Sequence, residues 1–227
     1  MAIQYKDIKP WGRSFDEYIK MFNLSEADLS KRIIGCGDGP ASFNAEMKKI
    51  GRKVISVDPI YVFSRKDIEN KIEEAKEEIV KQTMRNKNKF VWTQIKSIEH
   101  LLTLRMKTMK EFLLDYERGK TEGRYLAEEL PKLSFKNNTF DIALCSHLLF
   151  LYEENLPLEF HIAYVTEMLR IANDVRIFPI VNLNGLESMY IKKIENHFKG
   201  KGYKVEEKDV KYRFQKGAYK MLNITGG

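Results

Sequence analysis

The sequence has 227 residues, of which 43% are hydrophobic and 31% charged, and its formal net charge is +7 at pH 7. This length suits one α/β domain with insertions, and the composition excludes a disordered chain. The longest apolar run, Leu148 to Tyr152, is far too short to span a bilayer, and the first residues form no apolar signal region. We therefore expect a cytoplasmic protein with no membrane partner.

The first predicted element is a helix that begins near Ser14. Glu17 follows at capping-box spacing, and the apolar residues after it recur on one helical face. We expect an N-terminal helical segment over residues 1–30.

A strand, a tight turn and a helix come next. Ile33 and Ile34 run into the glycines of GCGDGP, and residues 41–51 have the pattern of a helix that ends at Gly51. The β-branched run of residues 53–57 then stops at a proline, as expected for a buried parallel strand. Together these segments predict the first βαβ unit.

Residues 64–122 have apolar side chains at helical spacings of three and four. A crossover between parallel strands needs only about a dozen residues, so this segment is much longer than the topology requires. We expect a helical insertion, or cap, after the second strand.

Strand patterns resume in the second half of the chain and alternate with two predicted helices, at 158–171 and 186–198. The strands are predicted at 124–128, 140–147, 175–181, 203–212 and 218–224. The last two are close enough to form a hairpin. The predicted fold is a single α/β domain over 1–227: a doubly wound, mostly parallel seven-stranded sheet with helices on both faces and an antiparallel C-terminal hairpin.

The glycine-rich turn is the first candidate binding element. Gly35, Gly37 and Gly39 lie between a strand and a helix, where a missing Cβ lets a ligand approach the backbone. Asp58 follows Gly39 by 19 residues and ends the second strand, where an acid reaches the hydroxyls of a ligand ribose. The combination predicts a nucleoside-binding site.

Three strings resemble the class I S-adenosylmethionine-dependent methyltransferases: IIGCGDGP, VISVDP and LAEELPKLSFKNNTFDIALCSHLLF. In that family a loop of the form acid-Ala-Glu-x-Leu-Pro lies beside the adenine, and a following Phe-Asp opens the fourth strand, which ends at the reaction site. The resemblance implies S-adenosylmethionine as the cofactor and methyl transfer as the reaction. The residues then expected to bind the cofactor are Arg13, Gly35, Cys36, Gly37, Asp38, Gly39, Asp58, Pro59, Ala127, Glu128, Cys145 and Ser146.

Several of these assignments have alternatives. Leu126 stands where many relatives carry an acid, so the adenine contact passes to Glu128 or to backbone atoms. Arg13 is either a clamp for the methionine carboxylate or a solvated surface residue. His147 ends the fourth strand and is either a general base or a partly buried imidazole bonded to nearby backbone. With only two cysteines and no CxxC pair, we expect no metal site.

The methyl acceptor is open between a small molecule and RNA. An insertion of this size suits an enclosed small-molecule site, which we favour. Basic segments that contain Phe90, Trp92, Tyr212 and Phe214 could stack bases and hold phosphates, but solvated helix and hairpin faces are the favoured interpretation. The alternative function is a module without catalysis, in which the basic helical insertion binds RNA or a protein. A nicotinamide-dependent oxidoreductase is a third hypothesis, but the later glycine of GxGxxG is missing. No pattern specifies an oligomeric state.

Overall fold

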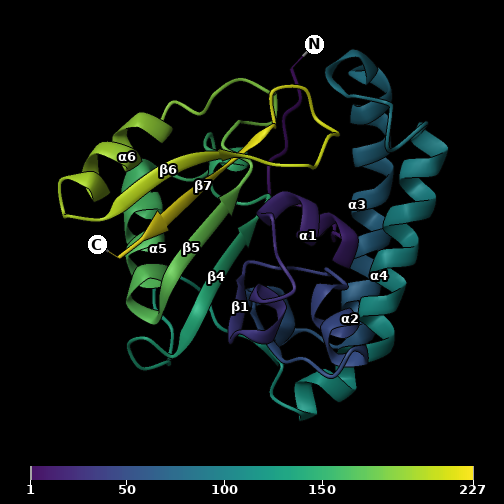
Figure 1. Ribbon diagram of the computed structural model, residues 1–227. Helices are drawn as coiled ribbons and strands as arrows, with labels where there is room; N and C mark the ends of the chain where they lie inside the picture. The colour runs from purple at the N-terminus through teal and green to yellow at the C-terminus, as the bar shows by residue number, and fades with distance from the viewer. Residues whose placement is uncertain (1, 227) are drawn as a thin grey trace.

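The computed structural model describes residues 2–226. Its centre is a seven-stranded sheet with the strand order β3-β2-β1-β4-β5-β7-β6 (Figure 1). The five strands from β3 to β5 are parallel, and β7 is antiparallel to both of its neighbours. The strands are β1 (Ile33–Cys36), β2 (Val54–Val57), β3 (Tyr125–Leu126), β4 (Phe140–Ser146), β5 (Ala172–Phe178), β6 (Lys204–Asp209) and β7 (Lys220–Thr225).

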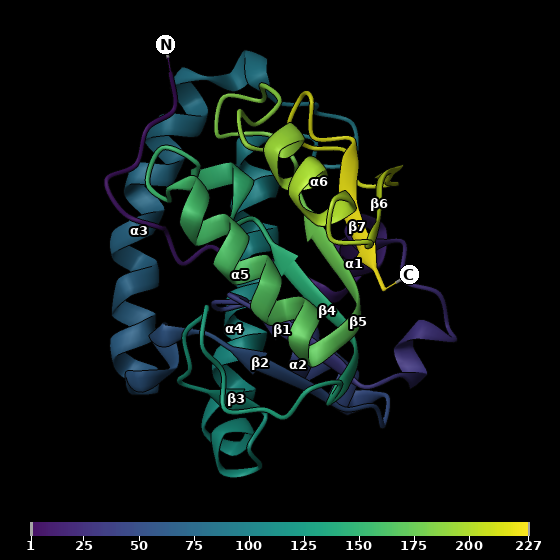
Figure 2. The ribbon, with the colours of Figure 1, turned by 90° about the vertical axis from the view of Figure 1, so that its left-hand side faces the viewer.

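Helices cover both faces of the sheet, as predicted for a doubly wound fold. Helices α5 and α6 pack on one face, and α1, α2, α3 and α4 lie on the other side (Figures 1 and 2). Their bounds are α1 (Phe15–Phe22), α2 (Phe43–Lys49), α3 (Arg65–Arg85), α4 (Ile98–Thr121), α5 (Leu158–Ile171) and α6 (Ile191–Lys199). Short 3-10 turns are η1 (Asp28–Ser30), η2 (Pro59–Val62), η3 (Lys87–Lys89) and η4 (Phe150–Tyr152).

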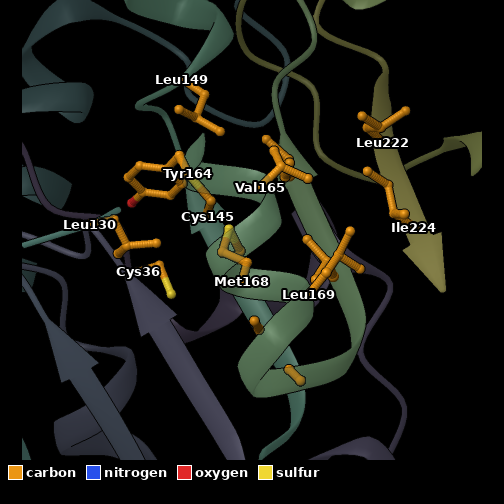
Figure 3. Close-up of a cluster of buried hydrophobic side chains, with 14 of the residues drawn as sticks. Cys36, Leu130, Cys145, Leu149, Tyr164, Val165, Met168, Leu169, Leu222 and Ile224 are labelled. Atoms are coloured by element: carbon orange, nitrogen blue, oxygen red, sulfur yellow. The ribbon is translucent and has the colours of Figure 1, made fainter. Parts of the chain in front are cut away.

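The hydrophobic core has a part on each face of the sheet. Below α5, side chains such as Val165, Met168 and Leu169 pack against strand residues that include Cys145 and Leu222 (Figure 3). On the opposite face, Tyr18 and Phe43 stack with ring centroids 4.6 Å apart and join α1 to α2. The sheet is therefore packed by a hydrophobic layer on each face.

The predicted helical insertion after β2 is confirmed. Ser64 and Ser97 cap α3 and α4, and each side chain accepts from a backbone N–H of the first turn. The two helices pack against each other, and Ile68 and Ile72 of α3 join a cluster with Phe112 and Tyr116 of α4. The insertion therefore has its own apolar contacts, and these continue to β3.

Some predicted boundaries were wrong. The strand expected at 124–128 covers only Tyr125–Leu126, because the Glu128 N–H donates to the Leu126 carbonyl and turns the chain away. The helix expected from 186 begins at Ile191, because the distant Glu153 carboxylate accepts from Ser188 Oγ at 2.5 Å and from the Met189 N–H at 2.8 Å. Within residues 2–226, every helix is too short or too polar to cross a bilayer.

Candidate active site

The strand order reverses between β1 and β4, whose neighbours continue outward on opposite sides. In open α/β sheets, ligands bind outside the carboxyl ends of the strands at such a reversal. The glycine-rich turn follows β1, and the segment Ser146–His147 ends β4, so both lie at this position. The topology therefore predicts a ligand site at this edge of the sheet.

The glycine-rich turn needs its glycines for two different reasons. Gly37 and Gly39 have φ of +70° and +51°, a region that side chains other than glycine rarely adopt. A Cβ on Gly37 would also lie 2.5 Å from the Leu148 side chain. At Gly35, a Cβ would lie 1.8 Å from an oxygen of the Asp38 carboxylate, which folds back over this position.

Asp38 holds the turn from beneath. Its carboxylate accepts hydrogen bonds from the Tyr18 hydroxyl at 2.7 Å and from Ser56 Oγ at 2.6 Å. Burial raises the pKa of Asp38 to about 6, and the two hydroxyl donors only partly oppose that rise. The carboxylate thereby ties the glycine-rich turn to α1 and β2.

Asp58 lies directly beyond β2 and meets the same turn. One carboxylate oxygen accepts from the Gly39 N–H and the other from the Ile60 N–H, both at 2.8 Å. Burial raises the pKa of Asp58 to about 6, against the effect of these two donors. Each oxygen has a further lone pair, so the carboxylate can also accept from the hydroxyls of a ligand.

A cavity of about 670 Å³ opens above these groups. Its volume is within the range of small-molecule sites. Nine of the predicted site residues line it: Arg13, Gly37, Asp38, Gly39, Asp58, Pro59, Glu128, Ser146 and His147. The remaining four do not. Gly35 lies under the Asp38 carboxylate, Ala127 is exposed, and the Cys36 and Cys145 side chains are buried in the core below α5 (Figure 3).

Arg13 lies in the cavity wall and is half-buried. One of its terminal nitrogens donates to the Trp11 carbonyl, while its buried Nε–H has no partner among the described residues. Burial lowers the pKa of Arg13, and the nearby Arg105 charge adds to the effect. The guanidinium therefore keeps donor capacity for a ligand anion.

His147 is held in an unusual backbone conformation, with φ of +56°. Its backbone N–H donates to the Phe178 carbonyl at 2.6 Å, and Nδ1 of its ring lies 2.9 Å from Ser146 Oγ. Burial, with the charges of Arg13 and Arg105, lowers the pKa of His147 well below its usual range, so the ring is neutral at pH 7. In the tautomer in which Nδ1 donates to Ser146, Nε2 is left as a proton acceptor.

Glu128 has partners within its own loop. Its carboxylate accepts from the Ser134 N–H at 2.9 Å and from Ser134 Oγ at 2.6 Å. These bonds join the two ends of the loop over residues 128–134, which follows β3 and contributes to the cavity wall. A ligand that binds the Glu128 carboxylate would therefore share it with Ser134 or replace Ser134 as its partner.

Two residues that contribute to the site were not predicted from the sequence. Arg105, only 1% exposed, forms a two-pronged ion pair with Glu17 at 2.5 and 2.7 Å, and the Tyr212 hydroxyl donates to the same carboxylate. A signal existed, because Arg105 interrupts the apolar stripe of Leu101 and Met109 at a spacing of four. The second is Tyr164, whose buried hydroxyl lines the cavity and has no partner among the described residues. No sequence signal marks Tyr164, because α5 comes to lie under the glycine-rich turn only in the folded chain.

The aromatic residues of the two basic segments pack against one another. Phe90 and Phe214 stack with centroids 4.9 Å apart, and Trp92 lies edge-on to Phe214 at 5.6 Å. Tyr212 is buried beside His147, with ring centroids 6.3 Å apart. Phe90, Tyr212 and Phe214 line the cavity, and Trp92 packs edge-on beside Phe214. Residues 2–226 contain no group of three or more metal-ligating side chains.

No protein-family model matches the sequence. The uncharacterized protein MJ0045 of Methanocaldococcus jannaschii is 37% identical over 224 residues, which cover 98% of this chain and 98% of that protein. Solved structures with a similar arrangement include magnesium protoporphyrin IX methyltransferase (ChlM) from Synechocystis PCC 6803 with bound SAM, at 12% identity and a TM-score of 0.48, over 89% of this chain and 73% of that one.

A further solved structure is a SAM-dependent methyltransferase from Aquifex aeolicus, at 12% identity and a TM-score of 0.44, over 92% of this chain and 93% of that one. The assignment of this chain to the class I methyltransferase fold rests on its own strand order and antiparallel last pair. The mostly parallel sheet and its antiparallel last pair agree with the fold predicted from the sequence.

Proposed function

We propose that this chain, which belongs to the same family as the Methanocaldococcus jannaschii protein MJ0045, is an S-adenosylmethionine-dependent methyltransferase. The observation that carries the proposal is the contact between the glycine-rich turn and Asp58, at the point where the strand order reverses. A backbone N–H of the turn and a carboxylate meet there at the edge of a cavity, the arrangement that holds a nucleoside in doubly wound folds.

The groups around the cavity fit this cofactor. Asp58 has lone pairs for the ribose hydroxyls. The buried Nε–H of Arg13 has no partner in the part of the chain that the structure describes, and it suits the methionine carboxylate. The Tyr164 hydroxyl also has no hydrogen-bond partner within residues 2–226, and it lies beneath Gly37, where an added Cβ would be 3.0 Å from it. Buried polar atoms without a bond are costly, so a polar ligand is expected to satisfy them.

When bound, S-adenosylmethionine supplies a methyl group that is already activated on a sulfonium. The chain then has to align the acceptor and exclude water, and the largely apolar cavity wall suits both tasks. His147 lines the cavity at the end of β4 and is the group placed to take a proton from an acceptor that must lose one. Its ring is neutral at pH 7 and can accept a proton, but the lowered pKa makes it a weaker base than a free imidazole. Ser146 would hold the ring in the tautomer that leaves Nε2 free.

A small-molecule acceptor is favoured over RNA. The insertion and the N-terminal segment both contribute to the cavity wall, and the aromatic rings of the basic segments are packed within the chain. A module that binds RNA or a protein without catalysis remains the alternative function. It would bind RNA in a salt-sensitive way and transfer no methyl group.

The test is a calorimetric titration of the purified protein with S-adenosylmethionine, S-adenosylhomocysteine and NAD. We expect the first two to bind one per chain and NAD to show no binding. Asp58→Ala removes charge-assisted hydrogen bonds to the ribose, which is expected to weaken binding about tenfold or more. Asp16→Ala, an exposed acid on α1, is the matched control and should bind like the parent. Absence of S-adenosylmethionine binding by the parent protein would overturn the proposal.

A further inference from the structure

We propose that residues 2–11 form a strap that detaches from the rest of the fold to let ligands enter and leave the cavity. The strap turns about Gly12 and Arg13, which stay attached to the glycine-rich turn. Detachment is a property of the chain itself, whereas the passage of the cofactor beneath the strap rests on the proposed function. Three features carry the inference: the place of the strap over the cavity, the contacts that hold it, and its fixed end.

The strap follows the cavity along most of its length. Six of its residues line the cavity: Ile3, Tyr5, Ile8, Lys9, Pro10 and Trp11. From residue 3 to residue 6, buried or half-buried side chains alternate with exposed ones, as in an extended chain with one side against a wall. Figure 2 shows the purple N-terminal trace running between α3 and α5. The strap therefore covers the cavity on this side of the molecule.

The strap also borders the exposed rim of the cavity. The exposed residues among those that line the cavity are Ile8, Pro59, Phe63, Glu74 and Glu129. Ile3 and Phe214, by contrast, are each less than a tenth exposed. A ligand that enters at the rim therefore passes the strap at Ile8, and one that fills the buried end lies beside Ile3.

The strap is held without backbone pairing. In the part of the chain that the structure describes, no hydrogen bond between backbone groups joins residues 2–11 to another segment. The Ile3 N–H donates instead to Asn184 Oδ1 at 2.9 Å. The Lys9 N–H donates to the Tyr152 hydroxyl at 3.2 Å. A segment held in this way opens at a lower free-energy cost than the strands and helices beneath it.

Two side chains on the exposed side fasten the strap, and we call them the latch. Asn155 donates through Nδ2 to the Tyr5 and Lys6 carbonyls, at 3.4 and 3.1 Å. Glu78 of α3 pairs with Lys9 Nζ at 2.7 Å. Asn155 is exposed and the Glu78 side chain is 41% exposed, so water replaces these partners when the strap lifts. The latch can therefore be released without unfolding the core.

The far end of the strap is fixed beside the glycine-rich turn. A Cβ on Gly12 would lie 2.0 Å from the Pro40 carbonyl oxygen, so a glycine is needed for the two segments to pack this closely. The Ser42 N–H donates to the Arg13 carbonyl at 3.1 Å. Gly12 and Arg13 are thereby held against the segment that precedes α2, and the movement is confined to the residues before them.

The first measurement follows detachment without any ligand. Ile3→Cys places a thiol at a cavity position that is 4% exposed, whereas the native Cys36 and Cys145 lie in the core below α5. Iodoacetamide reacts with each thiol only when it becomes exposed, and mass spectrometry gives the separate rates. We expect position 3 to react at least about a hundredfold faster than the native cysteines, which require unfolding of the core. Equal rates would show that the strap opens only with global unfolding, and the proposal would fail.

Weakening the latch should speed this reaction. In the Ile3→Cys background, Glu78→Gln together with Asn155→Ala removes the ion pair and both carbonyl contacts, and labelling is expected to become about tenfold faster. The matched control is Glu77→Gln together with Asn70→Ala. Both control positions are exposed on α3, and within residues 2–226 their side chains make no hydrogen bond or ion pair with the strap. Equal labelling rates in the latch variant and the control would contradict the role of the latch.

The second measurement is the exchange of S-adenosylhomocysteine in stopped-flow experiments on the same proteins. If the ligand passes only when the strap is open, the latch variant raises the association and dissociation rate constants by the same factor as the labelling rate, and Kd stays nearly unchanged. Faster labelling with unchanged rate constants would reveal another entrance and overturn the gating. A rise in the dissociation rate constant alone would indicate a lost contact with the bound ligand, and would overturn it as well.

The failure of this inference can be distinguished from the failure of the proposed function. If the parent protein does not bind S-adenosylhomocysteine, the proposed function fails together with the passage of this ligand, while thiol labelling still decides whether the strap detaches. If the parent binds S-adenosylhomocysteine and the latch variant exchanges it at the parent's rates, only the gating by the strap fails.

Discussion

Asp38 and Asp58 lie on either side of the same glycine-rich turn, and burial raises the pKa of each carboxyl to about 6. Their partners give them different roles. Asp38 accepts from two side-chain hydroxyls that belong to the core, whereas Asp58 accepts from backbone N–H groups at the cavity edge. We therefore assign Asp38 to holding the turn and propose Asp58 as the ribose contact.

The raised pKa of Asp58 predicts that cofactor affinity depends on pH. Only the ionised carboxylate can accept from both ribose hydroxyls, so S-adenosylmethionine affinity should rise as the pH increases through 6 and level off above about 7. At pH 5 about a tenth of the carboxyl is ionised in the free protein, so binding should be about tenfold weaker than at pH 8. Calorimetric titrations between pH 5 and 8 measure this change.

Asp58→Asn is the control, because its side chain does not titrate. Its weaker binding should lose the dependence due to this group and keep only any contribution from Asp38. An unchanged pH profile in Asp58→Asn would contradict the assignment.

The pH dependence of folding stability has the opposite sign to that of cofactor affinity. Because Asp38 and Asp58 bind protons more tightly in the folded state, their contribution to the free energy of unfolding falls as the pH rises from about 4 to 6.

At the scale of elements, the ion pair of Glu17 and Arg105 joins α1 to the inserted helix α4. Tyr212 adds the loop between β6 and β7 to the same network. Burial acts to raise the pKa of Glu17, but the Arg105 guanidinium outweighs it and lowers that pKa to about 2. Three elements far apart in sequence thus meet at one buried carboxylate at the base of the cavity.

Arg105→Met should lower the free energy of unfolding by about 3–5 kcal/mol, because it leaves the Glu17 carboxylate buried and unpaired. The double variant Glu17→Gln with Arg105→Met should lose less than the sum of the two single changes. Arg118→Met, on the exposed side of α4, is the control and should change stability by less than about 0.5 kcal/mol. Urea unfolding at pH 7 measures these differences, and additive losses would show that the pair is not coupled.

The whole molecule couples ligand binding to folding, because the cavity exists only when the sheet, the insertion and the N-terminal segment are assembled. A ligand that binds only the folded state stabilises it by mass action, by about 2.7 kcal/mol at a concentration 100 times its Kd. For a chain of this size, we expect S-adenosylmethionine to raise the Tm by about 5–10 °C. Thermal unfolding followed by circular dichroism measures the shift.

Asp58→Ala and NAD provide the controls for this shift. At the same ligand concentration, Asp58→Ala should show a smaller rise in Tm with S-adenosylmethionine than the parent protein. NAD should produce none. A rise of similar size with NAD would indicate a site for dinucleotides and contradict the proposed cofactor.

The sequence alone determined the features that depend on neighbouring residues. The capping box at Ser14, the glycine-rich turn and the acid at the end of β2 carry their signals within a few positions, and the structure has each element where it was predicted. The parallel sheet with its antiparallel last pair also followed from the order of segments, because short connections leave few topologies.

Only the tertiary structure decided which of these residues face the cavity. Cys36 and Cys145 adjoin the binding segments in sequence, but their side chains point into the core, because alternate residues of a strand face opposite sides of the sheet. Likewise, Glu153 sets the start of α6, and Arg105 and Tyr164 reach the site from helices distant in sequence. Such contacts depend on which surfaces pack together, and that choice is made by burial across the whole chain and not by local sequence.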